Sequence, residues 1–277
     1  MTKLYQQKGF TLVELAIVIT IIGLLIGGIL KGQQLINNAR VTAVINQVRA
    51  VEAASTTFYD SYGALPGDMD GTNRIPGCNN TGNCSVTPVT AQRNGIIGPS
   101  TWDTDGAQVT VATFPTAPAE TGETVLFWYY LGATGMLSGI DGSNLNGTGK
   151  VTFGELLPTT RLGGGFLVGY SSGAFGASRS NNTPISITGN VLKMAINPIS
   201  STGDGTAAGR LPLQPAVAAQ IDRKMDDGLP GAGTVQATGA AQCTFQIQGG
   251  GPIFSSDSAY FEANKSKDCG LLIAIQG

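Results

Sequence analysis

The sequence contains no histidine, and this absence restricts the chemistry that the chain can perform. Histidine is the commonest general base and the commonest metal ligand in proteins. Without it, the chain alone cannot form a Ser-His-Asp triad, and most kinds of zinc site are excluded as well. Residues 169–173 match the Gly-x-Ser-x-Gly nucleophile elbow of hydrolases, but no imidazole is present to take the proton of the serine. We therefore predict that the chain is not an enzyme.

Charged residues are also scarce, at 12% of the chain, and the formal net charge is only −2. The 16 Lys and Arg residues are scattered rather than clustered, so the sequence predicts no nucleic-acid partner. Glycine and proline, by contrast, number 40 and 13, which favours a loop-rich β domain over a helical bundle. The four cysteines indicate disulfides and an oxidising compartment.

Residues 10–30 form a long apolar run that a single charged residue, Glu14, interrupts. A helix of about 20 apolar residues spans a bilayer, so this run is long enough to cross a membrane. A short segment with the two basic residues Lys3 and Lys8 precedes it. An ordinary secretory signal would have a shorter apolar stretch followed by a small-residue cleavage site, and only residues 27–28 come near to such a site. The run therefore predicts a membrane-spanning helix rather than an ordinary signal.

Glu14 is the unusual residue of this run. A carboxylate inside the hydrocarbon region costs about 2.5–3.5 kcal/mol on insertion scales, so we expect it to have a partner. No Lys or Arg lies within the run. A cut after Gly9 would create a positively charged amine on Phe10. Because a helix does not easily fold its own end back onto its fifth residue, the amine of a neighbouring copy is the better partner. The alternative is a plain membrane anchor with a chance glutamate.

The helix is predicted to continue beyond the membrane. Residues 31–62 contain no proline, and mostly apolar residues recur there at alternating steps of three and four. Gly63 and Pro66 then supply the stop signals. The stripe is expected to pack on a sheet, and the alternative is a coiled-coil seam, which the sparse flanking charges disfavour. The stripe consists of Val41, Val44, Val48, Val51, Ser55, Phe58 and Tyr62.

The remaining residues, 63–277, are predicted to form one head, since no repeat and no long linker divides them. A helix is expected at residues 215–226, with Pro215 in its first turn, whereas residues 124–131 fit either a strand or a helix. The expected fold class is α+β, with the long N-terminal helix packed on an antiparallel sheet. Runs that predict strands lie at residues 165–170, 185–187, 191–196, 243–247 and 271–275.

The heptapeptide GFTLVEL at residues 9–15 resembles the prepilin peptidase recognition motif of type IV pilins and type II secretion pseudopilins. The motif is specific because a short basic leader, Gly9, Phe10, Glu14 and the apolar run occur together. The resemblance implies cleavage between Gly9 and Phe10, N-methylation of Phe10, and a use of Glu14 in the registration of subunits. Residues 62–68 and 221–230 also resemble segments of large prepilin-type proteins of Gram-negative bacteria.

The resemblance divides the chain into a prepilin leader (residues 1–9), a transmembrane or filament-core helix (10–30), its amphipathic continuation (31–62) and a head (63–277). The implied function is a structural subunit that polymerises into a type IV pilus or a type II secretion pseudopilus. The implied partners are other pilin or pseudopilin subunits, prepilin peptidase and the inner-membrane assembly machinery.

The implied location is the inner membrane, with a single pass and the head in the periplasm, and later a periplasmic or extracellular filament. Two alternatives stay open. One is a minor tip subunit that acts as an adhesin or ligand binder. The other is a membrane-anchored binding protein that does not polymerise.

Four cysteines allow three disulfide pairings. Cys78 and Cys84 enclose five residues and Cys243 and Cys269 enclose twenty-five, so pairing of neighbours needs the least rearrangement. A loop near the chain end closed by Cys243 and Cys269 also resembles the C-terminal disulfide loop of many pilins. We therefore expect the pairs Cys78–Cys84 and Cys243–Cys269.

Three aspartates are candidate metal ligands. Asp222 and Asp226 are neighbours at i, i+4 on the expected helix, where like charges repel, and Asp227 follows directly. A calcium ion would neutralise them, and calcium sites occur in some pseudopilin heads. Arg223, Lys224 or solvent screening would serve as well. No cofactor is required, and calcium is the one candidate.

Overall fold

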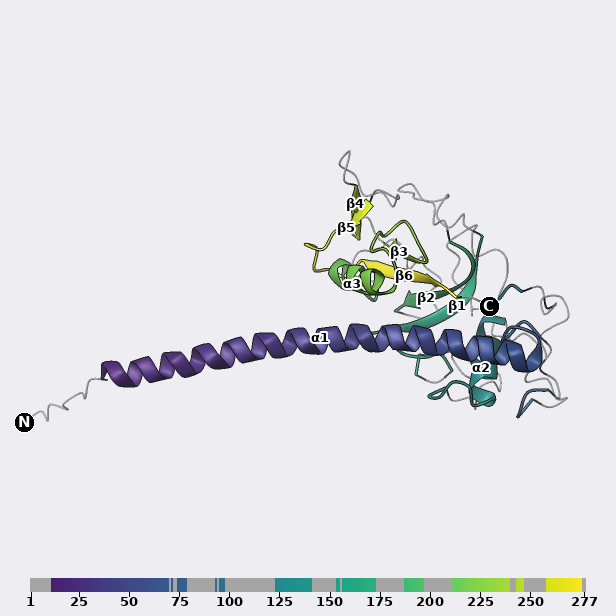
Figure 1. The fold of residues 1–277 in the computed structure, drawn as a ribbon, viewed down its shortest axis with the longest axis horizontal. Helices are drawn as coiled ribbons and strands as arrows, with labels where there is room; N and C mark the ends of the chain where they lie inside the picture. Colours follow the sequence, from purple (N-terminus) through teal and green to yellow (C-terminus); the bar gives the residue numbers. More distant parts are fainter. Residues whose placement is uncertain are drawn as a thin grey trace, which may run out of the picture.

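The structure is a computed structural model. It describes residues 11–69, 71, 74–78, 93, 95–97, 123–140, 153–154, 156–172, 187–196, 211–239, 243–246 and 258–275. The helices within these ranges are α1 (Leu12–Tyr62), α2 (Glu123–Ala133) and α3 (Pro215–Met225). The strands are β1 (Gly165–Ser172), β2 (Thr188–Ala195), β3 (Val235–Gly239), β4 (Thr244–Gln246), β5 (Ser258–Tyr260) and β6 (Cys269–Ala274). Figure 1 shows their arrangement, with the N-terminal half of α1 projecting away from the head.

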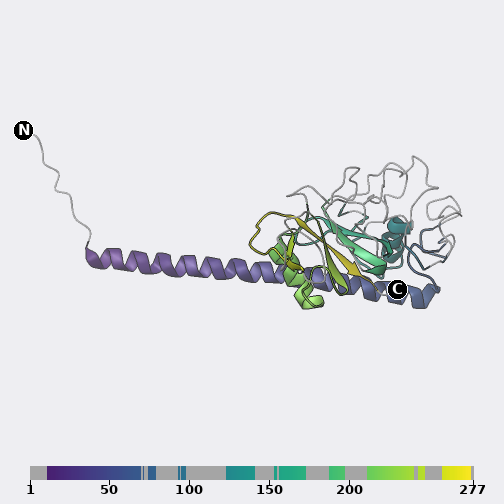
Figure 2. The same ribbon diagram turned by 90° about the horizontal axis from the view of Figure 1, so that it is seen from above.

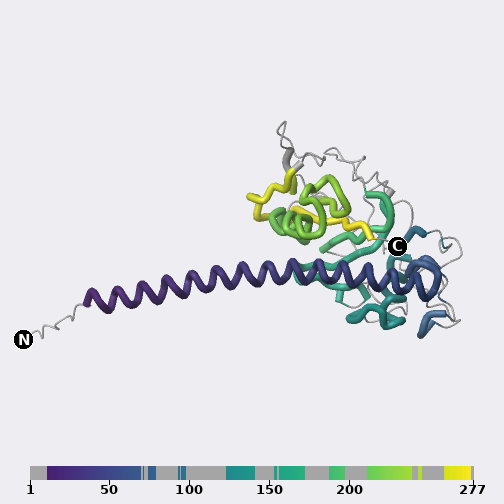
Figure 3. The backbone as a smooth tube through the Cα atoms, in the orientation of Figure 1, coloured from purple at the N-terminus to yellow at the C-terminus, as the bar shows by residue number. Residues whose placement is uncertain are grey.

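Helix α1 is a single uninterrupted element of 51 residues, as the sequence predicts. Thr11 is its N-cap, and no proline lies inside it. It ends at Gly63, which has a φ of 67° and donates its N–H to the carbonyl of Tyr59. Glycine suits this position because it adopts the left-handed conformation at no steric cost. Figure 3 traces the continuous helix from the free N-terminal half into the head.

The predicted stripe on α1 faces the head of its own chain. Tyr62 is only partly buried, but its ring stacks on that of Phe58 with 4.4 Å between centroids. Because the head of the same chain covers this face, the stripe is not a coiled-coil seam. The buried residues of α1 are Val41, Val44, Ile45, Val48, Val51, Ala54, Ser55 and Phe58.

Four antiparallel strands form the main sheet in the order β1-β2-β6-β3. Val191 of β2 lies opposite Gly169 of β1 and Ala274 of β6, and Ile273 of β6 lies opposite Val235 of β3. Helix α3 contacts α1 as well as β3, β5 and β6, while α2 contacts α1 and β1. Figure 2 shows the head lying along the C-terminal half of α1. These contacts confirm the α+β class with a long helix packed on an antiparallel sheet.

The structure also decides or corrects several local expectations. Residues 124–131, which fitted either a strand or a helix, lie in α2. All of them are buried, which explains why they are apolar on every side and carry no clear period. Strands β3 and β5 were not expected. Residues 185–186 of one predicted strand lie outside the described residues, whereas the helix predicted at 215–226 is confirmed as α3.

Candidate functional site

The N-terminal half of α1 carries a long apolar surface that nothing in the described chain covers. Among the described residues, α1 is the one helix long and apolar enough to cross a membrane, and its most apolar 18-residue window is 0% buried. An apolar surface of this extent requires lipid or another chain to cover it. The exposed apolar residues are Leu12, Val13, Leu15, Ile17, Val18, Ile19, Ile21, Ile22, Leu24, Leu25, Ile26, Ile29, Leu30, Leu35 and Ile36.

Glu14 lies at the start of this surface and forms a capping box with Thr11. The Thr11 Oγ1 accepts the N–H of Glu14 at 3.2 Å, and the Glu14 carboxylate accepts the N–H of Thr11 at 3.0 Å. The Thr11 hydroxyl also donates to the carboxylate, at 2.9 Å. Glu14 therefore has a hydrogen-bond partner, Thr11, in its own chain, whereas the charged partner expected from a neighbouring copy stays a prediction. Glu14 is three residues beyond the N-cap, the spacing at which a side chain reaches back to the cap.

Gly9 and Phe10, the predicted cleavage and methylation residues, lie outside the described residues. Thr11 follows Phe10 directly in the chain and keeps its backbone N–H after a cut between Gly9 and Phe10. The capping box is therefore compatible with processing at that bond. The roles of Gly9, Phe10 and Glu14 remain predictions.

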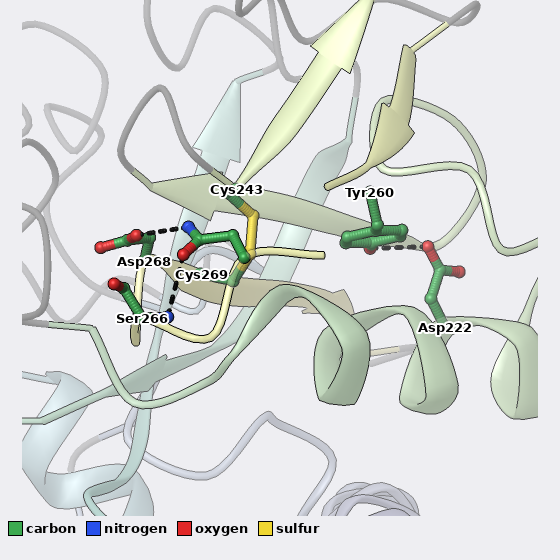
Figure 4. The surroundings of a disulfide bond; sticks show 7 residues. Asp222, Cys243, Tyr260, Ser266, Asp268 and Cys269 are labelled. Carbon is green, nitrogen blue, oxygen red and sulfur yellow. Dashed lines mark hydrogen bonds between the residues drawn. A yellow bond between two sulfur atoms is a disulfide. The ribbon is translucent and has the colours of Figure 1, made fainter. Parts of the chain in front are cut away.

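The three predicted acidic residues are brought together at the C-terminal end of α3. One oxygen of each carboxylate of Asp222, Asp226 and Asp227 lies within 4.8 Å of the others. Asp222 is fully buried and accepts the hydroxyl of Tyr260 at 2.8 Å and the N–H of Gly228 at 3.1 Å. Figure 4 shows the bond from Tyr260 to Asp222. Tyr260, 38 positions away in sequence, is a member of the site that the sequence did not predict.

Asp226 and Asp227 hold the loop that follows α3. Oδ2 of Asp226 accepts the backbone N–H groups of Thr234 and Val235, the latter at 3.1 Å. Asp227 Oδ1 accepts the N–H of Leu229 at 2.8 Å. Gly233 has a φ of 72°, and a Cβ on it would collide with the Asp226 carboxylate. Backbone N–H groups of the following loop thus surround the like charges. The sequence did not predict that these carboxylates hold the loop.

Burial controls the protonation of this cluster. Removal from water raises the pKa of Asp222 to about 6, although the hydrogen bonds from Tyr260 and Gly228 act in the opposite direction. Burial and the neighbouring Asp222 both raise the pKa of Tyr260, so its hydroxyl remains a donor at neutral pH. A carboxylate has about four lone-pair positions, more than the hydrogen bonds described here occupy. Because calcium takes oxygen ligands of this kind, the three carboxylates fit a calcium ion chemically.

The predicted pair Cys243–Cys269 is confirmed, with 5.1 Å between the Cα atoms. This disulfide joins the start of β4 to the start of β6 and closes the loop that contains β5 (Figure 4). Cys78 is also disulfide-bonded. Cys84, its predicted partner, lies outside the described residues, so that pair remains a prediction.

Comparison with known proteins assigns the N-terminus to a recognised class. Residues 4–30 match the prokaryotic N-terminal methylation motif, which is the signature of type IV pilins and pseudopilins. No curated protein sequence and no solved structure matches the chain. The chain is therefore pilin-like at residues 4–30 by sequence, and its long helix and antiparallel sheet are of the kind that the resemblance implied.

Proposed function

We propose that the chain is a structural subunit that polymerises into a type IV pilus or a type II secretion pseudopilus after cleavage and N-methylation. One observation carries this proposal. The exposed apolar half of α1 carries a charged residue, Glu14, near its start, inside the segment that matches the methylation motif. Lipid covers this surface while the subunit is anchored, and the helices of neighbouring subunits cover it in the filament.

Glu14 has a local and an intermolecular role in this proposal. Its capping-box bonds to Thr11 begin the helix, and its remaining lone pairs receive the amine on Phe10 of a neighbouring subunit. Two opposite unit charges at 4 Å attract each other by about 4 kcal/mol at an effective dielectric constant of 20. That attraction is available only when two helices stand in the correct register. Glu14 therefore aligns each incoming subunit.

Because of the capping box, the presence of Glu14 separates a filament subunit from a plain membrane anchor less well. A plain membrane anchor could use Glu14 as a cap, so the presence of the residue alone does not identify a filament subunit. What distinguishes the two functions is the negative charge, which a cap does not require. A minor tip subunit, the second alternative, would need the same charge but would occur only at filament ends.

The experiment compares the parent chain with Glu14→Leu in the membrane and sheared-filament fractions of the cells that make it. We expect the parent in both fractions and Glu14→Leu only in the membrane, because removing a carboxylate from the membrane-spanning run does not harm insertion. Equal amounts of both chains in the filament fraction would contradict the role of Glu14 in aligning subunits. A parent chain confined to the membrane would instead favour the anchored binding protein.

We also propose calcium as a ligand of the head, because the carboxylates of Asp222, Asp226 and Asp227 converge within 4.8 Å. The three residues would hold the ion through oxygen atoms, and the ion would offset their mutual repulsion. Its role would be structural. It would secure the loop that Asp226 already holds through Thr234 and Val235.

A further inference from the structure

The loop of residues 261–268 occupies a distinctive place in the head. It connects β5 to β6 and is coloured yellow in Figures 1 and 2. In both views it lies at the end of the head nearest to the N-terminal half of α1, and in Figure 1 it reaches further in that direction than α3 does. We call it the basic loop, because its two lysines, Lys265 and Lys267, are exposed, whereas its two acidic residues are a Glu262 paired with Arg223 and a buried Asp268. In an anchored subunit this end of the head faces the membrane.

The basic loop is held firmly to the rest of the head. The N–H of Phe261 donates to the carbonyl of Cys243 at 2.9 Å, and Cys243 is bonded to Cys269 at the other end of the loop. The side chain of Gln214 donates to the carbonyl of Lys265 at 2.7 Å. Figure 4 shows the disulfide beside this loop. The loop therefore presents a defined surface.

That surface is cationic and carries an exposed aromatic ring. Phe261 is 41% exposed, and Lys265 and Lys267 are both exposed. The ammonium of Lys265 donates to the backbone carbonyl of Glu262 at 3.4 Å, and the carboxylate of Glu262 pairs with Arg223. Among the described residues that is the one salt bridge, so neither lysine forms an ion pair with a described carboxylate.

Helix α1 has the same sign of charge below the head. Residues 15–40 contain Lys31 and Arg40 and no acidic residue. The chain as a whole has 18 acidic and 16 basic residues, and the acidic excess grows when the leader with Lys3 and Lys8 is removed. The charged residues of α1 between the apolar run and the head are thus both basic.

We propose that the basic loop rests on anionic phospholipid at the periplasmic surface of the membrane while the subunit is anchored. Val41 is the first residue of α1 that the head buries, and it lies ten residues beyond Lys31, about 15 Å along the helix. The lipid headgroups fill about 5–8 Å of this distance between Lys31 and Val41. The electrostatic effect of their charge extends about one Debye length, or about 8 Å, further. Because the loop points into the gap, its lysines lie within reach of the headgroup charge.

The exposed side chains of this region fit such a surface. Leu35 and Ile36 of α1 are exposed in the gap, and a bilayer interface close to the head would cover them. Phe261 would enter the interfacial layer, as Trp, Phe and Leu of segments that lie on a membrane surface do. An anionic lipid matches the charge of the two exposed lysines. The attraction would hold the anchored head against the membrane until a growing filament displaces the lipid contact.

The inference rests on the membrane anchoring of the proposed function, and the test separates the two. The full chain with Phe261→Trp is reconstituted into vesicles of phosphatidylcholine alone or mixed with phosphatidylglycerol. Lipids that carry a nitroxide quench the new tryptophan where the loop contacts the bilayer. The quenching of the chain that keeps Phe261 is subtracted, because the chain has two other tryptophans. Extraction at alkaline pH reports insertion of α1 independently. A chain that fails to insert contradicts the proposed anchor itself.

For a chain that inserts, we expect quenching in the anionic vesicles, weaker quenching in the neutral ones, and loss of the difference in high salt. Lys265→Gln and Lys267→Gln should each lower the ratio of contacting to free heads about fivefold, which corresponds to about 1 kcal/mol per cation near an anionic surface. Arg74→Gln is the matched control, because Arg74 donates to the carbonyl of Tyr62 at the opposite end of α1.

Three outcomes would overturn the inference. Equal quenching in neutral and anionic vesicles would remove the role of lipid charge. An effect of Arg74→Gln as large as that of the lysine variants would assign it to net charge rather than to the loop. The tryptophan could instead become less quenched as the protein-to-lipid ratio rises, whatever the lipid charge. That result would show that a second copy of the chain, rather than lipid, covers the basic loop.

Discussion

The hydroxyl of Tyr260 on β5 donates to the buried carboxylate of Asp222 on α3 across 2.8 Å. This bond ties the small β4-β5 sheet to the helix that connects the main sheet with α1. The bond matters because Asp222 is fully buried and a carboxylate deprived of water needs donors. The second donor is the N–H of Gly228, at 3.1 Å.

Tyr260→Phe should therefore destabilise the head although it removes only one oxygen atom. A buried acceptor left without its donor costs about 1–3 kcal/mol, and more when the acceptor is charged. Denaturant unfolding of the reduced and the oxidised chain measures the change. The double variant Asp222→Asn with Tyr260→Phe is the control. The double variant also removes the charge of the buried acceptor, so it should recover part of the stability that Tyr260→Phe loses. If Tyr260→Phe alone were as stable as the parent, this role of the bond would be contradicted.

Calcium should raise the melting temperature of the head. A ligand that binds only the folded state stabilises it by about 2.7 kcal/mol at a hundredfold excess over its dissociation constant. Asp227→Asn should reduce the calcium-induced shift, because Asp227 is the exposed member of the cluster and its carboxylate is converted to an amide. Asp60→Asn, on exposed α1 surface, is the matched control and should leave the shift intact. A melting temperature indifferent to millimolar calcium would mean that the N–H donors alone hold the cluster.

Both disulfides should be present in the exported protein, with no free thiol. Non-reducing peptide mapping should recover Cys243 joined to Cys269 and Cys78 joined to Cys84. Removal of the Cys243–Cys269 disulfide by Cys243→Ala and Cys269→Ala should lower the free energy of unfolding by about 3 kcal/mol in the chain-entropy model. Unfolding in denaturant measures this change. A peptide that joins Cys84 to Cys243 would contradict the arrangement of β4 and β6 described above.

The parts of the fold that local pattern determines could be predicted, and those that depend on distant contacts could not. The stripe from Val41 to Phe58 and the stop at Gly63 are periodic or conformational signals, and both match the structure. Helix α2 is buried on all sides, so its residues carry no period that separates helix from strand. Residues 235–239 and 258–260 are strands because β6 and β4 pair with them, and short runs of this kind have no signature of their own.

The same distinction applies to the candidate sites. The spacing predicted that Asp222 and Asp226 lie on one side of the helix with Asp227 next to them, and the three carboxylates do converge. The donors that surround them come from residues 228–235 and from Tyr260, and no local pattern in the sequence connects these to the helix. The capping box of Thr11 and Glu14 has a sequence signature, but the apolar run around Glu14 predicted an intermolecular partner for it instead.

Processing should occur at the bond between Gly9 and Phe10. Intact-mass analysis of the chain extracted from membranes should show a protein that starts at Phe10 and carries one added methyl group. The same analysis in cells without prepilin peptidase should show the unprocessed chain. A mature form that starts at Met1, or near residue 28, would contradict the reading of residues 9–15 as a prepilin motif.

The last prediction separates the two roles of Glu14 with Glu14→Gln. A glutamine at this position still accepts the N–H of Thr11 through its carbonyl oxygen, so the capping box is retained. It carries no charge and cannot attract the amine on Phe10 of a neighbour. If registration depends on the charge, Glu14→Gln should insert into the membrane as the parent does and yet be depleted from sheared filaments as strongly as Glu14→Leu.

Thr11→Ala is the matched control for the cap. It removes the hydroxyl that accepts the N–H of Glu14 at 3.2 Å but leaves the carboxylate in place. Loss of an N-cap costs about 1 kcal/mol, which a helix of 51 residues can tolerate, so this variant should still enter filaments. The opposite pattern, in which Glu14→Gln assembles and Thr11→Ala does not, would make Glu14 a helix cap and leave the alignment of subunits to some other contact.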